Sequence, residues 1–478
     1  MKRGIAVAVF LILSLSDCTL GPDYRRPDVE SPASWRFEEK ETKEVTDSAW
    51  WEQLGDPALN ELIEIALTEN KDVKIAAARI EEFTGQYVVT RSQLFPRIEA
   101  SASVERQRES GRGVISLPPT VKNPNDIYDA SFLANWEIDL WGKLRRATEA
   151  ARADLLSTVE ARRAVILSLV ASVNAAYVNL SGLDRQLEIT QATVGRRKES
   201  YRIFSRQYEK GLVSKLELYQ AKSQYEQALA AVPLIEKAIG QQEDAICLLL
   251  GRNPGPIKRG KTLEQFAVPA IPAGLPSSLL ERRPDIRQAE QNLIAANARI
   301  GVARAQFFPS ISLTGLFGWE STDLSKLFTG PARTWHYAVP VTQTIFAGGA
   351  LIGQLKAAEA VQKEALFQYQ AAIQKAFADV EDALIDQRRT REQLEALALQ
   401  VEDLREYARI ARLRYDNGYV SYLDVLDAER SLFAAELSYT QTQAALFQAL
   451  INLYKAMGGG WIDTVERKSV KGDGKPGA

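Results

Sequence analysis

The chain carries one pattern of residues twice, about two hundred residues apart. Residues 72–96 recur as residues 285–309, a shift of 213, and residues 208–214 recur as residues 415–421, a shift of 207. Both copies present the same motifs in the same order, so the second half of the chain is expected to fold as the first half does. The sequence therefore predicts one duplicated body rather than the roughly three unrelated domains that such a length could hold.

The charge balance and the scarcity of histidine and cysteine exclude several classes of function. The chain has 59 basic and 61 acidic residues, and its net charge of −2 gives no electrostatic footprint for nucleic acid. His336 is the one histidine, and Cys18 and Cys247 are the two cysteines. These numbers exclude a His/Cys metal site and a disulfide framework. A single histidine in a strand is also poor material for acid–base catalysis.

The N-terminus predicts export from the cytoplasm. Lys2 and Arg3 precede an apolar stretch at residues 5–15, which is too short to span a bilayer and is typical of a signal peptide over residues 1–17. Cys18 follows in a sequence close to a bacterial lipoprotein cleavage box, although Asp17 stands where such boxes normally have a small residue. An acyl chain on Cys18 would anchor the mature protein to a membrane. The alternative is an ordinary signal peptide that is cleaved nearby.

Long helices are expected in both copies. No proline interrupts residues 142–232 or 341–475, and apolar residues recur there at steps of three and four. Gly211 and Gly418 mark tight turns, because glycine tolerates left-handed backbone conformations and helical periodicity resumes after each of them. Each copy is therefore predicted to hold an antiparallel helical hairpin that packs as a coiled coil.

Each copy begins with a shorter helix. Between this helix and the long hairpin, the spacing of apolar residues changes from three or four residues to two. Apolar and polar residues alternate after Pro96 and Pro309, which predicts β-hairpins over about 97–140 and about 310–346. Leu133 and Leu316 are exceptions, since they interrupt the polar face. Strands of about ten residues with one apolar face fit a water-filled membrane barrel. They equally fit a soluble antiparallel sheet with one wet face.

Three features favour the barrel over the soluble sheet. They are the export signal, the aromatic residues near the strand ends, and the long polar loops at about 109–127 and 321–335. Four strands cannot close a membrane barrel, because an open sheet edge in lipid leaves backbone groups unpaired. Several chains are therefore expected to share one barrel.

Residues 255–262 match the phosphate-loop pattern G-x-x-x-x-G-K-[ST]. That motif binds phosphate where a buried strand precedes it and a helix follows it. Here a helix end precedes the glycine-rich segment, and Pro269 and Pro272 lie shortly after it. We therefore interpret the segment as a surface loop and not as the nucleotide site of an enzyme.

A charged cluster follows the second helical turn. Asp424, Asp427 and Arg430 are spaced i, i+3 and i+6 and so lie on one side of a helix. Glu217 holds the Asp424 position in the first copy. The simplest interpretation is a solvated helix face with an ordinary Asp427–Arg430 ion pair. In a symmetric oligomer the same residues would instead form rings of charge around an axis, which can select ions and latch a constriction.

Several short motifs occur in order along nearly the whole chain. They are Cys18-Thr19-Leu20-Gly21-Pro22-Asp23-Tyr24, Trp50-Trp51, Asp56-Pro57, Arg282-Arg283-Pro284-Asp285-Ile286, Phe307-Phe308-Pro309 and Gly458-Gly459-Gly460-Trp461. Together they resemble one family, the TolC-like outer-membrane factors of bacterial tripartite efflux pumps, and in particular its OprM/NodT lipoprotein branch.

The resemblance implies an α+β membrane protein. Three identical chains would each give four strands to one twelve-stranded β-barrel, which continues into a long periplasmic barrel of coiled-coil helices. The assembly would be a passive exit channel for drugs or other small molecules, located in the bacterial outer membrane and lipid-anchored at Cys18. Its partners would be outer-membrane lipid, a periplasmic adaptor protein and an inner-membrane transporter of the resistance–nodulation–division class. No enzymatic activity and no cofactor beyond the covalent lipid are expected.

The resemblance also assigns site residues. Asp424, Asp427, Arg430, Tyr415 and Glu217 match a gate at the helix tips, in which Asp427 and Arg430 form the latch. The adaptor would dock on the two helical turns. These turns consist of Gly211, Leu212, Val213 and Ser214 in the first copy and of Gly418, Tyr419, Val420 and Ser421 in the second.

The predicted domain order follows the repeat. A signal peptide (1–17) and an N-terminal equatorial segment (18–61) precede the first repeat (62–251). An equatorial linker (252–275), the second repeat (276–457) and a C-terminal equatorial tail (458–478) follow. Two other functions stay open on the sequence: a periplasmic coiled-coil scaffold or adaptor without a pore, and a channel that serves a secretion system.

Overall fold

The computed structural model describes residues 19–37, 49–110, 122–269 and 279–458, together with Pro276 and the short strands at 43–44 and 272–273. The predicted signal peptide, Cys18 and the tail beyond Gly458 lie outside the described residues. The chain divides into two compact units. Unit 1 comprises Met1–Asp28, Arg79–Thr158 and Gln288–Tyr369, and unit 2 comprises Val29–Ala78, Val159–Arg287 and Gln370–Ala478.

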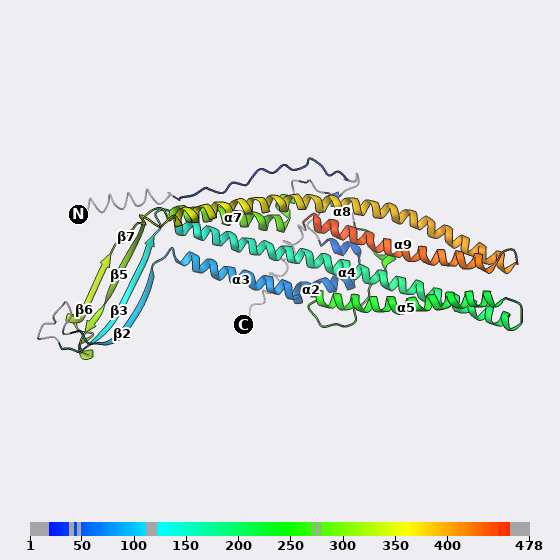
Figure 1. Ribbon diagram of the computed structural model, residues 1–478, viewed down its shortest axis with the longest axis horizontal. Helices are drawn as coiled ribbons and strands as arrows, with labels where there is room; N and C mark the ends of the chain where they lie inside the picture. Colours follow the sequence, from blue (N-terminus) through cyan, green and yellow to red (C-terminus); the bar gives the residue numbers. More distant parts are fainter. Residues whose placement is uncertain are drawn as a thin grey trace. The chain divides into compact units, whose positions relative to one another are not determined.

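Unit 1 contains an antiparallel sheet that both copies of the repeat build together (Figure 1). The two predicted β-hairpins lie next to each other, because a strand of the first pairs with a strand of the second. Within the described residues, the two outer strands of the sheet have a partner on one side only. In sheet order the strands are β2 (Arg97–Gln107), β3 (Asn125–Ile138), β5 (Ser310–Ser321) and β6 (Arg333–Ala338), with β7 (Val341–Thr342) also paired to β5.

The register of the sheet places the predicted apolar positions on one face. Ala100 of β2 lies opposite Phe132, which lies opposite Phe317 of β5. The two residues that interrupt the polar face are also explained, since Leu133 and Leu316 are direct cross-strand partners. They form one apolar pair on an otherwise polar face, with Glu99 of β2 and His336 of β6 on its two sides, and sequence periodicity does not reveal this contact.

The helices recur in pairs of equal length. α3 (Lys71–Ser92) and α7 (Pro284–Ala305) have 22 residues each. α4 (Lys143–Glu209) and α8 (Ala350–Asp416) have 67 each, and α5 (Lys215–Leu249) and α9 (Tyr422–Ala456) have 35 each. The predicted helical hairpins are therefore present in both copies. α5 continues through Pro233, so this helix extends beyond the proline-free stretch that indicated it.

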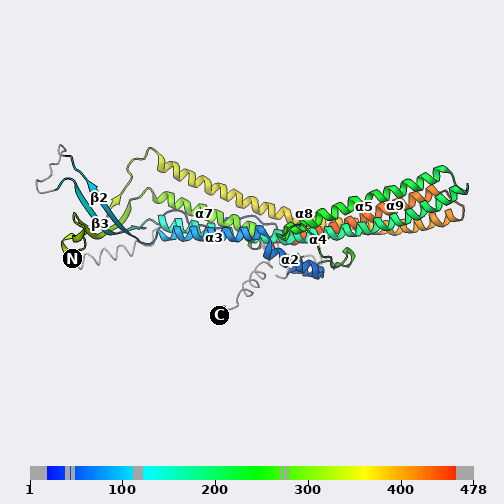
Figure 2. The same ribbon diagram turned by 90° about the horizontal axis from the view of Figure 1, so that it is seen from below.

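In unit 2 the two hairpins run alongside each other (Figures 1 and 2). Their shared core includes Val170, Tyr177, Ile246 and Phe447, to which Trp50 from the N-terminal segment adds its ring. α4 is long and apolar enough to cross a bilayer by composition, but 61% of its apolar window is buried within the chain, as in a core helix. The first short helix, α2 (Pro57–Glu69), packs into the same core through Leu59 and Ile63.

The N-terminal segment and the linker between the repeats contact each other in unit 2. β1 (Lys43–Glu44) pairs in parallel with β4 (Pro272–Ala273). The buried side chain of Asp56 caps α2 by accepting from the Ala58 amide at 2.8 Å, and it also accepts from the linker amide of Lys261 at 2.8 Å.

This contact explains the segment that resembles a phosphate loop. The amides of Gly260 and Lys261 donate to the Tyr177 hydroxyl and to the Asp56 carboxylate, each at 2.8 Å. The Tyr177 hydroxyl in turn donates to Asp56 at 3.0 Å. The anion in front of these amides is thus the Asp56 side chain of the same chain. Between this segment and Pro269, where the described stretch ends, the one helical element is the three-residue turn at Leu263–Gln265. Burial raises the pKa of Tyr177, which keeps its hydroxyl protonated as a donor.

Candidate functional site at the helical turns

The two helical turns have the same backbone geometry, although 207 residues separate them. Gly211 and Gly418 adopt φ values of 71° and 76°, in the left-handed region that glycine enters without strain. In each turn the amide after the glycine donates to the carbonyl five residues earlier, at 2.9 Å. This is the Schellman geometry, and it ends α4 and α8 in the same way.

The helices that follow the turns begin with matching caps. The amide of Ser214 donates to the Glu217 carboxylate at 2.8 Å, and the amide of Ser421 donates to the Asp424 carboxylate at 3.0 Å. Both serine hydroxyls donate to the same carboxylates. Glu217 and Asp424 therefore occupy equivalent positions, as the repeat predicted. Each carboxylate also lies in the first turn of its helix, where an acidic side chain interacts favourably with the helix dipole.

Asp424, Asp427 and Arg430 lie on one face of α9 and line a groove of about 690 Å³. Arg430 donates to Asp427 at 2.8 Å, so the predicted pair forms within a single chain. The two side chains are 64% and 52% exposed, and such a pair contributes less than about 1 kcal/mol to stability. The rest of the groove is formed by the following residues of α5, α8 and α9: Leu216, Tyr219, Gln220, Ser223, Gln224, Tyr407, Leu423 and Leu426.

Tyr415 belongs to a small aromatic core between the two hairpins. Its ring lies 5.4 Å from that of Tyr422, which lies 4.0 Å from the ring of Phe204 on the other hairpin. Burial and the charge of Glu217 raise the pKa of Tyr415. Burial also raises the pKa of Tyr422 to about 12. The structure thus places Tyr415 where it holds the hairpins together, half-buried rather than free at the turn.

The turns present exposed apolar side chains around the glycines. Leu212 and Tyr419 are exposed within the turns themselves, and Leu216 and Leu423 are exposed in the first turns of α5 and α9. A group of exposed apolar residues of this kind is typical of a surface that binds another protein.

Two charged side chains between the hairpins were missed by sequence reasoning. Arg197 of α4 is almost fully buried, donates to the Gln224 carbonyl at 3.0 Å, and lies 5.4 Å from the Phe433 ring centre. Glu429 of α9 is half-buried, and burial raises its pKa against the opposing charges of Arg412, Arg197 and Arg196. The available signal was that Glu429 stands between Val425 and Leu432 on one face of α9. Arg197 stands between Thr193 and Ser200 on the buried face of α4 and gave no comparable signal.

A second feature that the sequence did not assign is a buried arginine at the other end of α9. Arg283 is 7% exposed and donates to both oxygens of Asp285 at 3.0 and 2.7 Å, to Asp379 at 2.8 Å, and to the Ala456 carbonyl at 3.2 Å. Burial acts to raise the pKa of Asp285, but the hydrogen bonds and charge of Arg283 hold it below its usual value.

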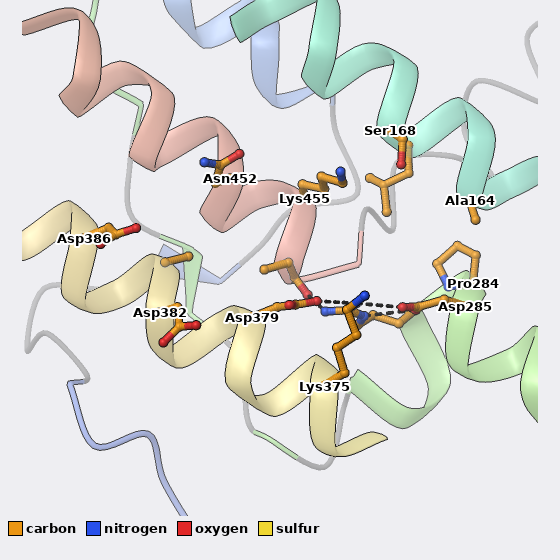
Figure 3. A pocket seen from close by; sticks show the side chains of 14 residues that line it. Ala164, Ser168, Pro284, Asp285, Lys375, Asp379, Asp382, Asp386, Asn452 and Lys455 are labelled. Atoms are coloured by element: carbon orange, nitrogen blue, oxygen red, sulfur yellow. Dashed lines mark hydrogen bonds and ion pairs between the residues drawn. The ribbon is translucent and has the colours of Figure 1, made fainter. Parts of the chain in front are cut away.

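Figure 3 shows this cluster, with Asp285 at the start of α7 and Asp379 on α8. The marked interactions join each of the two carboxylates to Arg283. The cluster lies in a groove of about 490 Å³. The groove is also lined by charged and polar side chains of α8 and α9, namely Lys375, Asp382, Asp386, Asn452 and Lys455. Cys247, near the end of α5, lies in the core of unit 2 and donates to the Gly255 carbonyl at 3.2 Å.

Comparison with known proteins gives one consistent result. Residues 62–252 and 275–459 match the family model described as outer membrane efflux protein. The toluene efflux pump outer membrane protein TtgC of Pseudomonas putida is 34% identical over 472 residues, which cover 96% of this chain and 95% of TtgC.

Two further similarities concern the membrane and the channel. The probable outer membrane lipoprotein SilC of Salmonella typhimurium is 34% identical, and the match covers 96% of this chain and 99% of SilC. The crystal structure of the open state of the MtrE outer membrane channel of Neisseria gonorrhoeae has a TM-score of 0.84 and 33% identity, covering 93% of this chain and 99% of MtrE.

Proposed function

The chain belongs to the outer membrane efflux protein family, and from this premise we propose that three copies of it form one passive exit channel. The channel lies in the bacterial outer membrane and has a large periplasmic helical portion. It conducts small molecules outward for an efflux pump and makes or breaks no bond. TtgC, at 34% identity, is named for toluene efflux, which supports small apolar solutes as one class of cargo.

The observation that carries this proposal is the sheet of unit 1. It has one continuous apolar face, with Ile98, Val104, Phe132 and Phe317 exposed on it. Its outer strands, β2 and β6, have unpaired edges within the described residues. Lipid tolerates an apolar face but not an open edge. Pairing the β2 edge of one chain with the β6 edge of the next removes both edges, and three copies of four strands close a twelve-stranded barrel of the kind that membranes accept.

The domain division and the lipid anchor belong to the same proposal. Residues 62–251 and 276–457 are two copies of one unit, which the equal helix lengths support. Residues 18–61, the linker 252–275 and the tail 458–478 form the equatorial region, and the pairing of β1 with β4 supports the contact between the first two of these. The similarity to SilC, named as an outer membrane lipoprotein, supports acylation of Cys18.

The partners of the channel follow from its place in a pump. A periplasmic adaptor docks on the turns at residues 211–214 and 418–421, where apolar side chains are exposed. An inner-membrane transporter of the resistance–nodulation–division class supplies the energy. In the resting state three copies of Asp424 and Asp427 form rings around the axis. Arg430 and Tyr415 hold α9 in its inward position, while Glu217 takes the Asp424 position on the other hairpin.

Single-channel recording in planar bilayers tests this function. The wild-type mature protein is compared with Asp427→Asn/Arg430→Gln, which removes the ion pair but keeps the Asp424 cap. We expect small cation-selective openings from the wild type and larger, less selective ones from the variant, because ring charge selects ions and the pair restrains the helix.

A matched control removes the Glu199–Arg202 pair on α4, which has the same i,i+3 spacing and similar exposure. Glu199→Gln/Arg202→Gln should leave conductance unchanged. A folded wild-type oligomer that never conducts would reject the channel and favour a periplasmic scaffold. Equal conductance of the wild type and the Asp427→Asn/Arg430→Gln variant would keep the channel but reject the gate at these residues.

A further inference from the structure

The two copies of the repeat anchor their hairpins at equivalent positions but with different chemistry. In the first copy Asn70 donates to the Leu249 carbonyl, at the end of α5, at 2.8 Å. In the second copy Arg283 donates to the Ala456 carbonyl, at the end of α9, at 3.2 Å. Asn70 and Arg283 differ by the shift of the first repeated segment, and Leu249 and Ala456 differ by the shift of the second. One structural contact is therefore made twice, by a neutral amide and by a cation.

Arg283 connects more helices through its side chain than Asn70 does. The Asn70 side chain also accepts from the Val73 amide, which caps its own helix. Arg283 holds Asp285 in the first turn of α7 with two hydrogen bonds and reaches Asp379 on α8 with a third. At the position of Asp379 the first copy has an exposed serine, Ser172, so its hairpin has no equivalent ion pair.

We propose that Arg283 is a positioning residue that sets the resting position of the gate-bearing hairpin by clamping the middle of α8, at Asp379, and the end of α9 to the start of α7. This inference rests on the proposed function, because it assigns regulation to the same gate. α9 carries Asp424 and Asp427 in its first turns and the contact with Arg283 at its last residue. A continuous helix of 35 residues is a stiff element of about 50 Å, so a shift at its base is transmitted to its tip.

We call the contacts of Arg283 with Asp285, Asp379 and the Ala456 carbonyl the clamp. Its strength comes from the burial of Arg283 and from the geometry of the guanidinium. Arg283 uses its planar guanidinium to donate to two carboxylates and a carbonyl in a nearly solvent-free position. Charge-assisted hydrogen bonds of this kind are about twice as strong as neutral ones. The Arg283 side chain is buried, whereas those of Asp285 and Asp379 are partly exposed, so removing a carboxylate leaves the guanidinium charge buried with fewer partners. The first copy instead has an exposed pair, Arg252–Glu69, which adds little restraint.

The test gives the second copy the residues of the first. Arg283→Asn/Asp379→Ser is compared with the wild type and with Asp382→Ser, which changes an aspartate of the same groove that is not part of the clamp. Trimer assembly is checked first, and then resting conductance and amide hydrogen exchange are measured. We expect resting conductance to rise several-fold in the double variant, and exchange in the last turn of α9 to rise about ten-fold. Exchange at the end of α5, and conductance in Asp382→Ser, should stay at wild-type values.

The remaining outcomes of this experiment either support or reject the clamp. A folded double variant with faster exchange in α9 but wild-type conductance would show that Arg283 only stabilises the fold, and it would overturn the proposal. If the double variant does not assemble, Asp379→Ser alone decides, since it keeps the Arg283–Asp285 contact. A smaller rise in its conductance supports the clamp, and no rise rejects it. A wild type that does not conduct would instead reject the proposed function.

Discussion

At the scale of single residues, the space between the two hairpins holds a carboxylate that is poorly solvated. Glu429 is half-buried on α9 and faces Arg412 of α8 and Arg196 and Arg197 of α4. Burial raises its pKa more than these arginines lower it. The folded protein therefore binds a proton at Glu429 more tightly than the unfolded chain, in which a glutamate titrates near about 4.3. Stability gained from this group must grow as pH falls through its raised pKa and must be lost as pH rises again.

Glu429→Gln should therefore change the pH dependence of stability. Glutamine mimics the neutral carboxyl, so at pH above the raised pKa the variant avoids the cost of burying the charge and should have the higher Tm. The difference should shrink on acidification and vanish near pH ~3, about one unit below the unfolded value, where the carboxyl is protonated in both the folded and the unfolded states. Thermal unfolding in detergent across this pH range measures the effect. Glu395→Gln, at an exposed position of α8, serves as the control and should shift Tm equally little at every pH. A lower Tm for Glu429→Gln at neutral pH would mean that the arginines outweigh burial.

At the scale of elements, the linker between the repeats is fixed by Asp56. A side chain at Gly260 would overlap the Asp56 carboxylate, whereas one at Gly255 would meet no atom within 4 Å. Asp56 cannot easily move away, because it also caps α2 and accepts from Tyr177.

Gly260→Ala is therefore expected to destabilise the protein by about 1–3 kcal/mol, the usual cost of forcing atoms into a packed site. Gly255→Ala, in the same loop, should be close to neutral. Both effects are measured as shifts in Tm of the purified protein. If the two alanine variants have equal Tm values, the loop is not held by Asp56 in the way described, and its resemblance to a phosphate loop needs a different explanation.

The elements themselves could be predicted from the sequence because their signals are local. The strand period and the glycines of the turns both act within a few residues. The contacts that fix the elements are not local. Leu133 and Leu316 look like errors of alternation until β3 and β5 are paired, and Arg283 looks like one of two adjacent arginines until α8 is placed beside it.

The candidate site likewise contains features that could be predicted from the sequence and contacts that could not. The equivalence of Glu217 and Asp424 was predicted from the repeat, and the pairing of Asp427 with Arg430 from spacing on one helix. The serine caps that these two carboxylates complete were not predicted. The aromatic core around Tyr415 was not predicted, because Phe204 approaches it from the other hairpin. The gate itself depends on three copies around an axis, and that arrangement stays a prediction of the proposed assembly.

At the scale of the whole molecule, the proposed assembly assigns opposite surroundings to neighbouring residues of one strand. Ala102 lies on the apolar face of β2, opposite Ala130, and Ser103 lies on the polar face, opposite Asp129. In a membrane barrel the first faces lipid and the second faces water in the lumen. In a scaffold outside the membrane, both positions would contact water as they do in the single chain, where both side chains are exposed.

Arginine substitution at these two positions separates the alternatives. In a lipid-facing position at mid-strand an arginine costs about 2–4 kcal/mol, whereas a lumen-facing arginine is solvated. Ala102→Arg should therefore reduce the amount of trimer recovered from the outer membrane. Ser103→Arg should assemble normally and lower cation selectivity, because it adds positive charge to the lumen beside Asp129. Outer-membrane fractionation, gel analysis of the trimer and bilayer recording measure these effects. If both variants assemble equally well, β2 does not face lipid, and the scaffold alternative gains over the barrel.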